Sequence, residues 1–376
     1  MKGRAVVLVF LAVAACQAQY NAHVLHSPAV PSPFSFGAGA GGGQQVGHTN
    51  IILNGPSNAL LWSGTAGSLV NLHPAGFAAS YAMDTDGTNQ IGWRVVAGFG
   101  AFATMWSGTA ESWVNLNHPK YLGSIARGIG GGQQVGEGVP LGQHPDLYEA
   151  LLWHGTAESQ VNLHPGPEFD RSSASATDGK QQVGVVSHPS TERNAALWSG
   201  TGQSFVNLDP VGIGESWAEG VAKGQQVGSA LFPNTPVVAA LWQDSSETFI
   251  NLNPNLAPNL GSQAFDTNGF QQVGIAGFPV KEFAQIHATA WNGTPESYMD
   301  LHDFLPSQHH GEGAESWAQG IDEFGNIVGW AADLKDGGRQ KAVLWTPVPE
   351  PSSAIALTAG LLLLAAHRLR RTAHKR

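Results

Sequence analysis

Short runs in which apolar and polar residues alternate recur along most of this chain, and turn residues separate them. One copy reads Ser216-Trp217-Ala218-Glu219-Gly220, then Gln225-Gln226-Val227-Gly228, then Ala240-Leu241-Trp242, then Phe249-Ile250-Asn251-Leu252. Such alternation, broken by Gly, Asn or Asp every roughly 8–12 residues, is typical of short β-strands joined by tight turns. The Asp178-Gly179 and Asn268-Gly269 pairs stand where hairpins should turn. We therefore predict four strands in each copy.

The unit recurs seven times, and each of its steps can be followed through the copies. A small-residue strip opens at Ser35, Ser80, Ser124, Ser172, Ser216, Ser262 and Ser316. A Gln-Gln-Val-Gly-like step follows with Val46, Ile91, Val135, Val183, Val227, Val273 and Val328. A step ending in tryptophan follows at Trp62, Trp106, Trp153, Trp198, Trp242, Trp291 and Trp345. Four strands in about 45 residues, repeated, indicate a propeller blade, so we predict an all-β seven-bladed propeller over residues 19–347.

The small strip and the tryptophans have distinct roles in such a fold. Strands nearest the axis are crowded by all blades, so Ser, Ala and Gly let the sheets converge there. The seven tryptophans are expected further out, where each fills the widening wedge between blades. We interpret them as a structural core and predict no cofactor.

The count of strands also predicts how the ring closes. A Val-Asn-Leu-like step recurs only six times, with Leu72, Leu116, Leu163, Leu208, Leu252 and Leu301. The segment Val24-Leu25-His26-Ser27-Pro28 is similar to Val161-Asn162-Leu163-His164-Pro165. We therefore expect an N-terminal strand to complete the blade formed by residues 316–345, which leaves no exposed sheet edge.

The unit resembles the HAF repeat family of extracellular proteins. The similarity is clearest in His287-Ala288-Thr289-Ala290-Trp291, Met299-Asp300-Leu301, Ser316-Trp317-Ala318-Gln319-Gly320-Ile321-Asp322 and Gly325-Asn326-Ile327-Val328-Gly329. It covers most of residues 35–345. The resemblance implies an extracellular repeat protein and assigns no activity.

The N-terminus has the pattern of a signal peptide. Lys2 and Arg4 precede the apolar run Ala5–Ala15, which is too short to remain as a membrane span. We predict a signal peptide over residues 1–18, with cleavage near Ala18. The stretch Val13-Ala14-Ala15-Cys16 is also similar to a lipobox, which would leave Cys16 lipidated.

The C-terminus, residues 348–376, has three parts. The motif Val348-Pro349-Glu350-Pro351 precedes the stretch Ser352–His367, and a basic tail follows with Arg368, Arg370, Arg371, Lys375 and Arg376. Sixteen helical residues reach about 24 Å, short of the ~30 Å hydrocarbon core, so a helix here anchors only with snorkelling arginines or local thinning. A basic tail retained in the cytoplasm places the body outside it.

These three parts resemble the PEP-CTERM sorting signal. That resemblance implies recognition by an exosortase, a membrane protease that removes or replaces the segment. It also implies a transient inner-membrane anchor followed by a cell-surface or extracellular location. The alternative is an ordinary tail anchor.

Charge and cysteine usage narrow the function further. Residues 19–347 hold 11 Lys and Arg against 27 Asp and Glu, a balance of −16. Nucleic-acid binding needs clustered cations, so we exclude it. The only cysteine is Cys16, so the body has neither disulfides nor thiol chemistry.

Two loop motifs look like ligand sites but have simpler interpretations. Gly37, Gly39 and Gly42 spell G-x-G-x-x-G without the βαβ context of a nucleotide site, which indicates an inner strand. The segment Asp84-Thr85-Asp86-Gly87-Thr88-Asn89 resembles a calcium loop but lacks its full spacing and distal Glu. A tight turn is the preferred interpretation, and calcium is the alternative.

Histidines form the remaining candidates. They recur after the Val-Asn-Leu step at His73, His118, His164 and His302, on separate blades and therefore too far apart for one metal. His309 and His310 lie near Glu312 and Glu315; we interpret this segment as a solvated loop insertion, with a zinc site as the alternative. We predict no metal.

The sequence contains no G-x-S-x-G elbow, no H-E-x-x-H motif and no cysteine nucleophile. We predict a non-catalytic surface or matrix protein that contacts extracellular polysaccharide or surface proteins. The copies differ most before the tryptophan, as in Gly136–Glu149, Val185–Asn194 and Ser229–Val238, and these loops should crowd one binding face. The alternatives are a glycan or peptide hydrolase or lyase with its site at the axis, and a spacer without a ligand.

Overall fold

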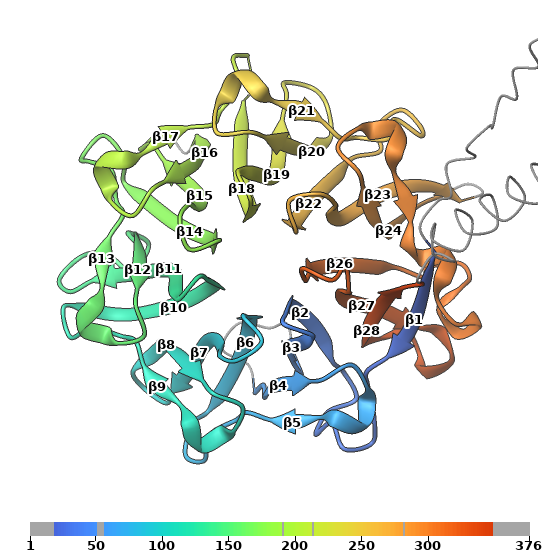
Figure 1. Cartoon of the computed structure of the whole chain (residues 1–376), viewed down its shortest axis with the longest axis horizontal. Helices are drawn as coiled ribbons and strands as arrows, with labels where there is room; N and C mark the ends of the chain where they lie inside the picture. Colours follow the sequence, from blue (N-terminus) through green and yellow to red (C-terminus); the bar gives the residue numbers. More distant parts are fainter. Residues whose placement is uncertain (1–18, 51–55, 190–191, 213, 281–282, 349–376) are drawn as a thin grey trace, which may run out of the picture. The chain divides into compact units, whose positions relative to one another are not determined.

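The computed structural model describes residues 19–50, 56–189, 192–212, 214–280 and 283–348. Residues Ala22–Thr346 form one unit, in which seven four-stranded sheets surround a central axis (Figure 1). The prediction of an all-β seven-bladed propeller is confirmed. The other unit comprises residues 1–21 and 347–376, of which residues 19–21, 347 and 348 are described.

Each blade takes its strands from one sequence copy. Blade 1 contains β2 (Phe36–Gly41), β3 (Gln44–His48), β4 (Ala59–Trp62) and β5 (Val70–Asn71). Blade 2 contains β6 (Ala79–Thr85), β7 (Gln90–Val96), β8 (Gly100–Trp106) and β9 (Val114–Asn115). Blade 3 contains β10 (Tyr121–Gly130), β11 (Gln133–Pro140), β12 (Glu149–Trp153) and β13 (Val161–Asn162). Blade 4 contains β14 (Arg171–Thr177), β15 (Gln182–Ser187), β16 (Arg193–Trp198) and β17 (Val206–Asn207). Blade 5 contains β18 (Glu215–Ala222), β19 (Gln225–Leu231), β20 (Val237–Trp242) and β21 (Ile250–Asn251). Blade 6 contains β22 (Ser262–Thr267), β23 (Gln272–Val280), β24 (Phe283–Trp291) and β25 (Met299–Asp300). Blade 7 contains β26 (Ser316–Ile321), β27 (Ile327–Asp333), β28 (Arg339–Pro347) and, as its outermost strand, β1 (Tyr20–Val24).

Only short 3-10 turns interrupt the strands in the described part of the chain. Six of them join the third and fourth strands of blades 1 to 6: η1 (Ala66–Ser68), η2 (Ala110–Ser112), η3 (Ala157–Ser159), η4 (Gly202–Ser204), η5 (Ser246–Thr248) and η6 (Pro295–Ser297). Of the others, η7 (Leu301–Phe304) lies against β24 of blade 6, and η8 (Ser307–His309) and η9 (Leu334–Asp336) lie at blade 7. The predicted C-terminal helix lies outside the described residues, as do the signal peptide, Cys16, Pro349–Pro351 and the basic tail.

The tryptophans fill the outer wedges between neighbouring blades. All seven indoles are fully buried. Trp242 of blade 5, for example, packs in one cluster with Val183, Leu197 and Leu208 of blade 4. Such burial contributes several kcal/mol for each aromatic side chain, so these positions stabilise the ring.

The repeated glutamine has a specific structural role. In blades 1 to 6 the second Gln of the step accepts a hydrogen bond from a backbone amide in the turn after the tryptophan, as Gln182 Oε1 does from Gly200 N at 2.7 Å. The other five bonds are equivalent and span 2.7–2.8 Å, from Gly64 to Gln45, Gly108 to Gln90, Gly155 to Gln134, Asp244 to Gln226 and Gly293 to Gln272. Ile327 occupies this position in blade 7, where β1 replaces the local fourth strand.

The opening serine links each blade to the one before it. In every blade its Oγ accepts a hydrogen bond from the backbone amide of an alanine on the third strand of the preceding blade, at 2.9–3.3 Å. The hydroxyl also bonds to the residue after the Val-Asn-Leu step, as Ser216 Oγ does to Asp209 Oδ1 at 2.6 Å. Because a carboxylate only accepts, this serine is the donor.

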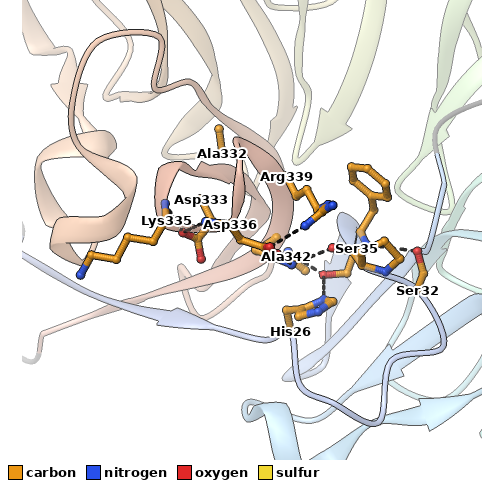
Figure 2. Close-up of polar contacts among 12 residues, drawn as sticks. His26, Ser32, Ser35, Ala332, Asp333, Lys335, Asp336, Arg339 and Ala342 are labelled. Carbon is orange, nitrogen blue, oxygen red and sulfur yellow. Dashed lines mark hydrogen bonds and ion pairs between the residues drawn. The ribbon is translucent and has the colours of Figure 1, made fainter.

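The same link closes the ring at blade 7. The amide of Ala342 donates to Ser35 Oγ at 3.0 Å, and His26 Nδ1 lies 2.9 Å from that oxygen (Figure 2). Leu25, which is fully buried, donates its amide to the Ala342 carbonyl at 2.8 Å, as Leu163 does to Ala150 in blade 3. The segment 24–28 therefore takes the place of the missing Val-Asn-Leu step, and the predicted closure is confirmed.

Candidate functional site: an inter-blade pocket beside the axis

The variable loops gather at one end of the axis. Consecutive strands of a blade are antiparallel, so the connection between the second and third strands lies at the end where the innermost strand begins. The segments singled out for their variation, such as Val185–Asn194, contain these connections. They form one loop-rich face, as the sequence predicts.

A β-bulge interrupts every innermost strand, a feature that the alternation pattern did not predict. The bulged residue lies three positions after the opening serine in all seven blades: Ala38, Met83, Arg127, Ser175, Glu219, Phe265 and Gln319. The glycine of the Gln-Gln-Val-Gly step lies opposite the strand just before the bulge. A Cβ on Gly184 would lie 1.9 Å from the Ser173 carbonyl oxygen, which explains why only glycine fits there.

The bulged residue and a cross-strand pair next to it occupy the inner wedge between blades on the loop-rich face. In blades 7, 1 and 2 these pairs are Trp317 with Trp330, Phe36 with His48, and Tyr81 with Trp93. Their rings touch from blade to blade, with centroid separations of 5.9 Å for Phe36 and Trp330 and 5.3 Å for His48 and Tyr81. Phe265 of blade 6 stacks on Trp317 at 5.6 Å. Aromatic side chains therefore fill these wedges.

Blade 4 has small residues at the same positions, and a pocket results. Its cross-strand pair is Ser173 with Val185, and its bulged residue is Ser175. A cavity of about 370 Å³ opens here between blades 3, 4 and 5. We call it the inter-blade pocket; its lining residues are Arg127, Glu137, Tyr148, Ser173, Ser175, Val185, Arg193, Trp217 and Glu219.

The polar wall of the pocket is held by charge-assisted hydrogen bonds. Arg127 Nε and one terminal guanidinium nitrogen each donate to a different oxygen of Glu137, both at 2.7 Å. The hydroxyl of Ser173 also donates to Glu137. This bidentate geometry fixes both side chains against blade 4. Their exposed fractions, 38% for Arg127 and 14% for Glu137, show that the pair faces the pocket without being sealed from solvent.

Glu219 forms the opposite wall and has an altered proton affinity. Burial raises the pKa of its carboxyl, whereas the charge of Arg127 and a hydrogen bond with Ser175 act in the other direction. Trp217, two residues earlier on β18, is half-buried and presents an aromatic surface to the same cavity. The pocket thus combines an aromatic face with carboxyl, guanidinium and hydroxyl groups, a composition suited to a small polar ligand.

The other mouth of the axis contains a second cavity, of about 520 Å³. Asp84 and Asp266 line it, and burial together with their mutual repulsion raises the pKa of Asp84 to about 8. Burial raises the pKa of Asp266 to about 7. Each carboxylate accepts backbone amides, from Thr85 and Ile129 for Asp84 (2.8 and 2.9 Å). These aspartates join blade 2 to blade 3 and, through Ile321, blade 6 to blade 7.

The calcium-like segment is a tight turn in the structure. Asp86 Oδ1 accepts the amides of Thr88 and Asn89 at 2.9 and 2.7 Å, an Asx turn. Gly37, Gly39 and Gly42 lie on β2 or its turn, where a Cβ would meet backbone of the neighbouring blades within 3.0 Å. Across the described residues, no group of three or more His, Cys, Asp or Glu is arranged to hold a metal ion.

The histidines after the Val-Asn-Leu step are structural partners of the opening serines. His73, His164 and His302 place Nδ1 2.8–2.9 Å from the serine of the next blade. The expectation for His118 was wrong: Asn117 occupies that position and accepts from Ser124 Oγ at 2.7 Å. A single-residue shift in the alignment of the repeats caused the error, because both residues are polar and adjacent.

The interpretation of this segment as a solvated loop insertion is confirmed for His310, Glu312 and Glu315, which are exposed, and is wrong for His309. His309 is fully buried, with Nδ1 2.9 Å from the Ala332 carbonyl oxygen. His310 lines a cavity of about 690 Å³ with His287 and His302, whose rings stack at 4.0 Å. His287 Nδ1 contacts Asp300 Oδ2 at 2.7 Å. Burial, and to a smaller extent the charge of the neighbouring His287, lowers the pKa of His302 to about 3. His309 therefore fixes the insertion to blade 7, whereas His310 stays on its exposed side.

Comparison with known proteins identifies the fold and no family. No family model and no curated protein matches the sequence. The β-propeller domain of the Trilobed protease from Pyrococcus furiosus, described as having an open velcro topology, is similar with a TM-score of 0.53 and 9% identity over 83% of this chain and 93% of that one. Here, in contrast, β1 closes the last blade.

Two further structures are similar at lower scores. TolB from Acinetobacter baumannii has a TM-score of 0.45 and 8% identity over 68% of this chain and 62% of that chain. A puromycin hydrolase has a TM-score of 0.47 and 14% identity over 84% of this chain and 51% of that chain. This chain therefore spans less than two thirds of either protein, and the likeness extends to the fold alone. Within the described ranges, no helix has the length and apolar character needed to cross a membrane.

Proposed function

We propose that this chain is an exported cell-surface or extracellular-matrix protein that binds polysaccharide without transforming it, and that the inter-blade pocket holds a sugar unit of the polymer. The observation that carries the proposal is the pocket itself. Seven blades share one architecture, yet blade 4 leaves its inner wedge unfilled, and the space is lined by hydrogen-bonding groups together with Trp217.

The chemistry of the lining supports a sugar as the ligand. A pyranose ring has an apolar face of C–H groups, which an indole can cover, and a rim of hydroxyls that both donate and accept. Arg127, Glu137 and Glu219 supply donors and acceptors within one cavity. A few fixed polar groups beside an aromatic surface are the usual means of orienting such a ligand.

Export and sorting rest on the two chain ends. The signal-peptide pattern of residues 1–18 and the three-part segment 348–376 imply secretion and recognition by an exosortase-type protease. Mass spectrometry of the mature protein, together with cell fractionation, tests both. Cleavage near Ala18 and loss or exchange of the C-terminal segment are expected, and a protein retained intact in the cytoplasm contradicts export.

Binding is tested with the purified propeller on immobilised polysaccharides and envelope fractions. Trp217→Ala is expected to weaken retention at least tenfold. Phe270→Ala is the matched control, because Phe270 is 73% exposed and lies on the turn between β22 and β23, away from the loop-rich face. Failure of the unaltered protein to bind any polymer, or equal loss in both variants, contradicts the proposal.

A glycan hydrolase is the second candidate, because Glu137 and Glu219 line the same cavity. Two carboxyls in different environments are the usual acid and base of glycoside hydrolysis. Binding is favoured here, because both oxygens of Glu137 already accept hydrogen bonds from Arg127 and Ser173. Release of reducing ends by the unaltered protein but not by Glu219→Gln supports the hydrolase instead.

A further inference from the structure

We infer that the inter-blade pocket selects an uncharged sugar unit over an acidic or an amino sugar of the same shape, an inference that rests on the proposed function. The charged side chains that line the pocket are two arginines and two glutamates: Arg127, Arg193, Glu137 and Glu219. Their formal charges cancel. A pocket of this kind offers many hydrogen bonds but no net attraction for an ion.

The positions of the charges reinforce this selectivity. Arg127 and Glu137 are already engaged with each other through two bonds of 2.7 Å. A ligand carboxylate near Arg127 would therefore approach Glu137 as well, and a ligand ammonium near Glu137 would approach Arg127. Either ion would lose its water and meet a like charge as well as an opposite one, which is unfavourable in a partly buried site.

Uncharged hydroxyls have the opposite property. Each can donate to a carboxylate oxygen and accept from a guanidinium or serine hydroxyl in the same contact, so the pair can be bridged without being broken. Ser173 already bonds to Glu137 in this way. Like the serine, a sugar hydroxyl adds to the network and leaves the ion pair intact.

The surroundings discriminate against acidic polymers in particular. Residues 19–347 carry a balance of −16. Beyond the pocket, a polyanion therefore meets a repulsive field that salt screens but does not reverse. The selectivity against uronate polymers should consequently decrease, without inverting, as ionic strength rises.

The volume sets the size of the ligand. A cavity of about 370 Å³, bounded by blades 3, 4 and 5, accommodates one or two pyranose rings and not a longer segment. Binding should therefore be inhibited by a monosaccharide that matches the preferred unit of the polymer.

Two series of three sugars of similar shape test the inference with the full propeller. Galactose, galacturonate and galactosamine, and the matching glucose series, share one ring and differ in charge; each is used to displace the protein from the polymer that retains it. Within the series that matches the polymer, we expect the neutral sugar to displace the protein at a concentration at least tenfold below either charged sugar. Stronger displacement by the uronate or the amino sugar overturns the inference and leaves polysaccharide binding intact.

A variant that fills the pocket locates the effect. Ser175→Phe introduces a ring at a bulge position where Phe265 stands in blade 6, so the fold accepts this residue type. It should abolish displacement by the neutral sugar, whereas Gln319→Phe, the same ring at the bulge of blade 7 and outside the pocket, should retain it. Displacement that persists in Ser175→Phe, or retention on polymer that no monosaccharide reverses, overturns the assignment of this pocket. Absence of retention on every polymer instead removes the proposed function, and the inference with it.

Discussion

The outer and inner wedges between blades lie a few strands apart, yet they differ in how strictly their residues repeat. Every outer wedge receives a fully buried tryptophan from the third strand. The inner wedges on the loop-rich face receive aromatic pairs in blades 7, 1 and 2, an ion pair in blade 3 and small residues in blade 4. Both wedges join adjacent sheets, so this contrast separates positions that form the ring from positions that shape a site.

The difference has a geometric cause. Blades diverge away from the axis, so each outer gap must be filled by a large apolar side chain or become a cavity. Near the axis the sheets already approach each other through Ser, Ala and Gly, and the bond from the preceding blade to each opening serine holds them together. An inner wedge can therefore vary, or stay open, with little loss of stability.

Removal of the closing strand should have the largest effect. Without residues 19–26 the chain loses fully buried Leu25, its bond to Ala342 and the His26–Ser35 contact, and β28 becomes an exposed edge. One buried leucine alone contributes about 2–5 kcal/mol against a typical total of 5–15 kcal/mol. We expect loss of a cooperative thermal transition, measured by circular dichroism.

A permuted chain provides the control for this truncation. In this variant, residues 20–28 are moved to the position after residue 346. A copy of residues 199–205, the turn between the third and fourth strands of blade 4, joins the two segments. The same strand can then pair with β28 in a local hairpin. Recovery of the transition is expected. A truncated protein that melts like the intact one would show that the ring does not depend on this strand.

Replacement of one outer-wedge indole should have the next largest effect. Trp198→Ala leaves a cavity against Val135, Leu152 and Leu163 of blade 3 and should lower the free energy of unfolding by about 3–5 kcal/mol. Chemical denaturation measures it. Ser175→Phe, an inner-wedge change on the same blade, should alter that energy by less than about 1 kcal/mol. Equal costs at the two sites would contradict the distinction between wedges.

Asp84 and Asp266, which line the cavity at the other mouth of the axis, should make the free energy of unfolding fall as pH rises. The carboxyl of Asp84 has an ordinary pKa of 3.8 and a folded-state pKa of about 8. Between these values the folded protein holds a proton on Asp84 that the unfolded chain releases, so this carboxyl lowers the free energy of unfolding as pH rises, by at most about 1.4 kcal/mol per pH unit. Asp266, with a folded-state pKa of about 7, adds to the slope below that pH. Denaturation midpoints at pH 4 to 9 should show this slope.

Asp84→Asn separates this effect from the loss of a contact. Asparagine cannot ionise, but it accepts only through one oxygen, so one amide bond to Thr85 or Ile129 is lost at about 1–2 kcal/mol. The variant should be less stable than the unaltered protein near pH 4, and its slope should be shallower. Parallel pH profiles for the two proteins would exclude Asp84 as the source.

The ring was predictable from the sequence because its determinants repeat. Serine, glycine and tryptophan recur in seven copies, and the one copy that lacks a Val-Asn-Leu step identifies the N-terminal segment as the closing strand. The inter-blade pocket was not predictable in the same way. It depends on residues that do not repeat, such as Ser173 and Arg127, and on a bulge that brings them together.

A signal for the bulge was nevertheless present in the sequence. The third residue after each opening serine ranges from alanine to arginine, while the residue before it is always Gly or Ala and the one after it is Gly, Ala or Asp. A pattern of strict two-residue alternation places that residue among the crowded axial positions. The variation of its side chain therefore could not be recognised as the sign of a bulge. The burial of His309 was missed for another reason, since packing of an insertion depends on contacts that no repeat encodes.

Exchange among bulge residues should have the smallest effect and gives the finest test of the comparison. Gln319→Met places in blade 7 the residue type found at Met83 of blade 2, and Gln319 is half-buried and lies outside the inter-blade pocket. The free energy of unfolding should change by no more than about 0.5 kcal/mol, because the bulge is held by backbone pairing and by Gly329, whose Cβ would lie 1.8 Å from the Trp317 carbonyl oxygen. Polymer binding should not change either.

Gly329→Ala is the contrasting variant at the same bulge. It should lower the free energy of unfolding by several kcal/mol, since its methyl group displaces that carbonyl. A large effect of the side-chain exchange beside a small effect of the glycine change would reverse the assignment of structural and variable positions around the axis.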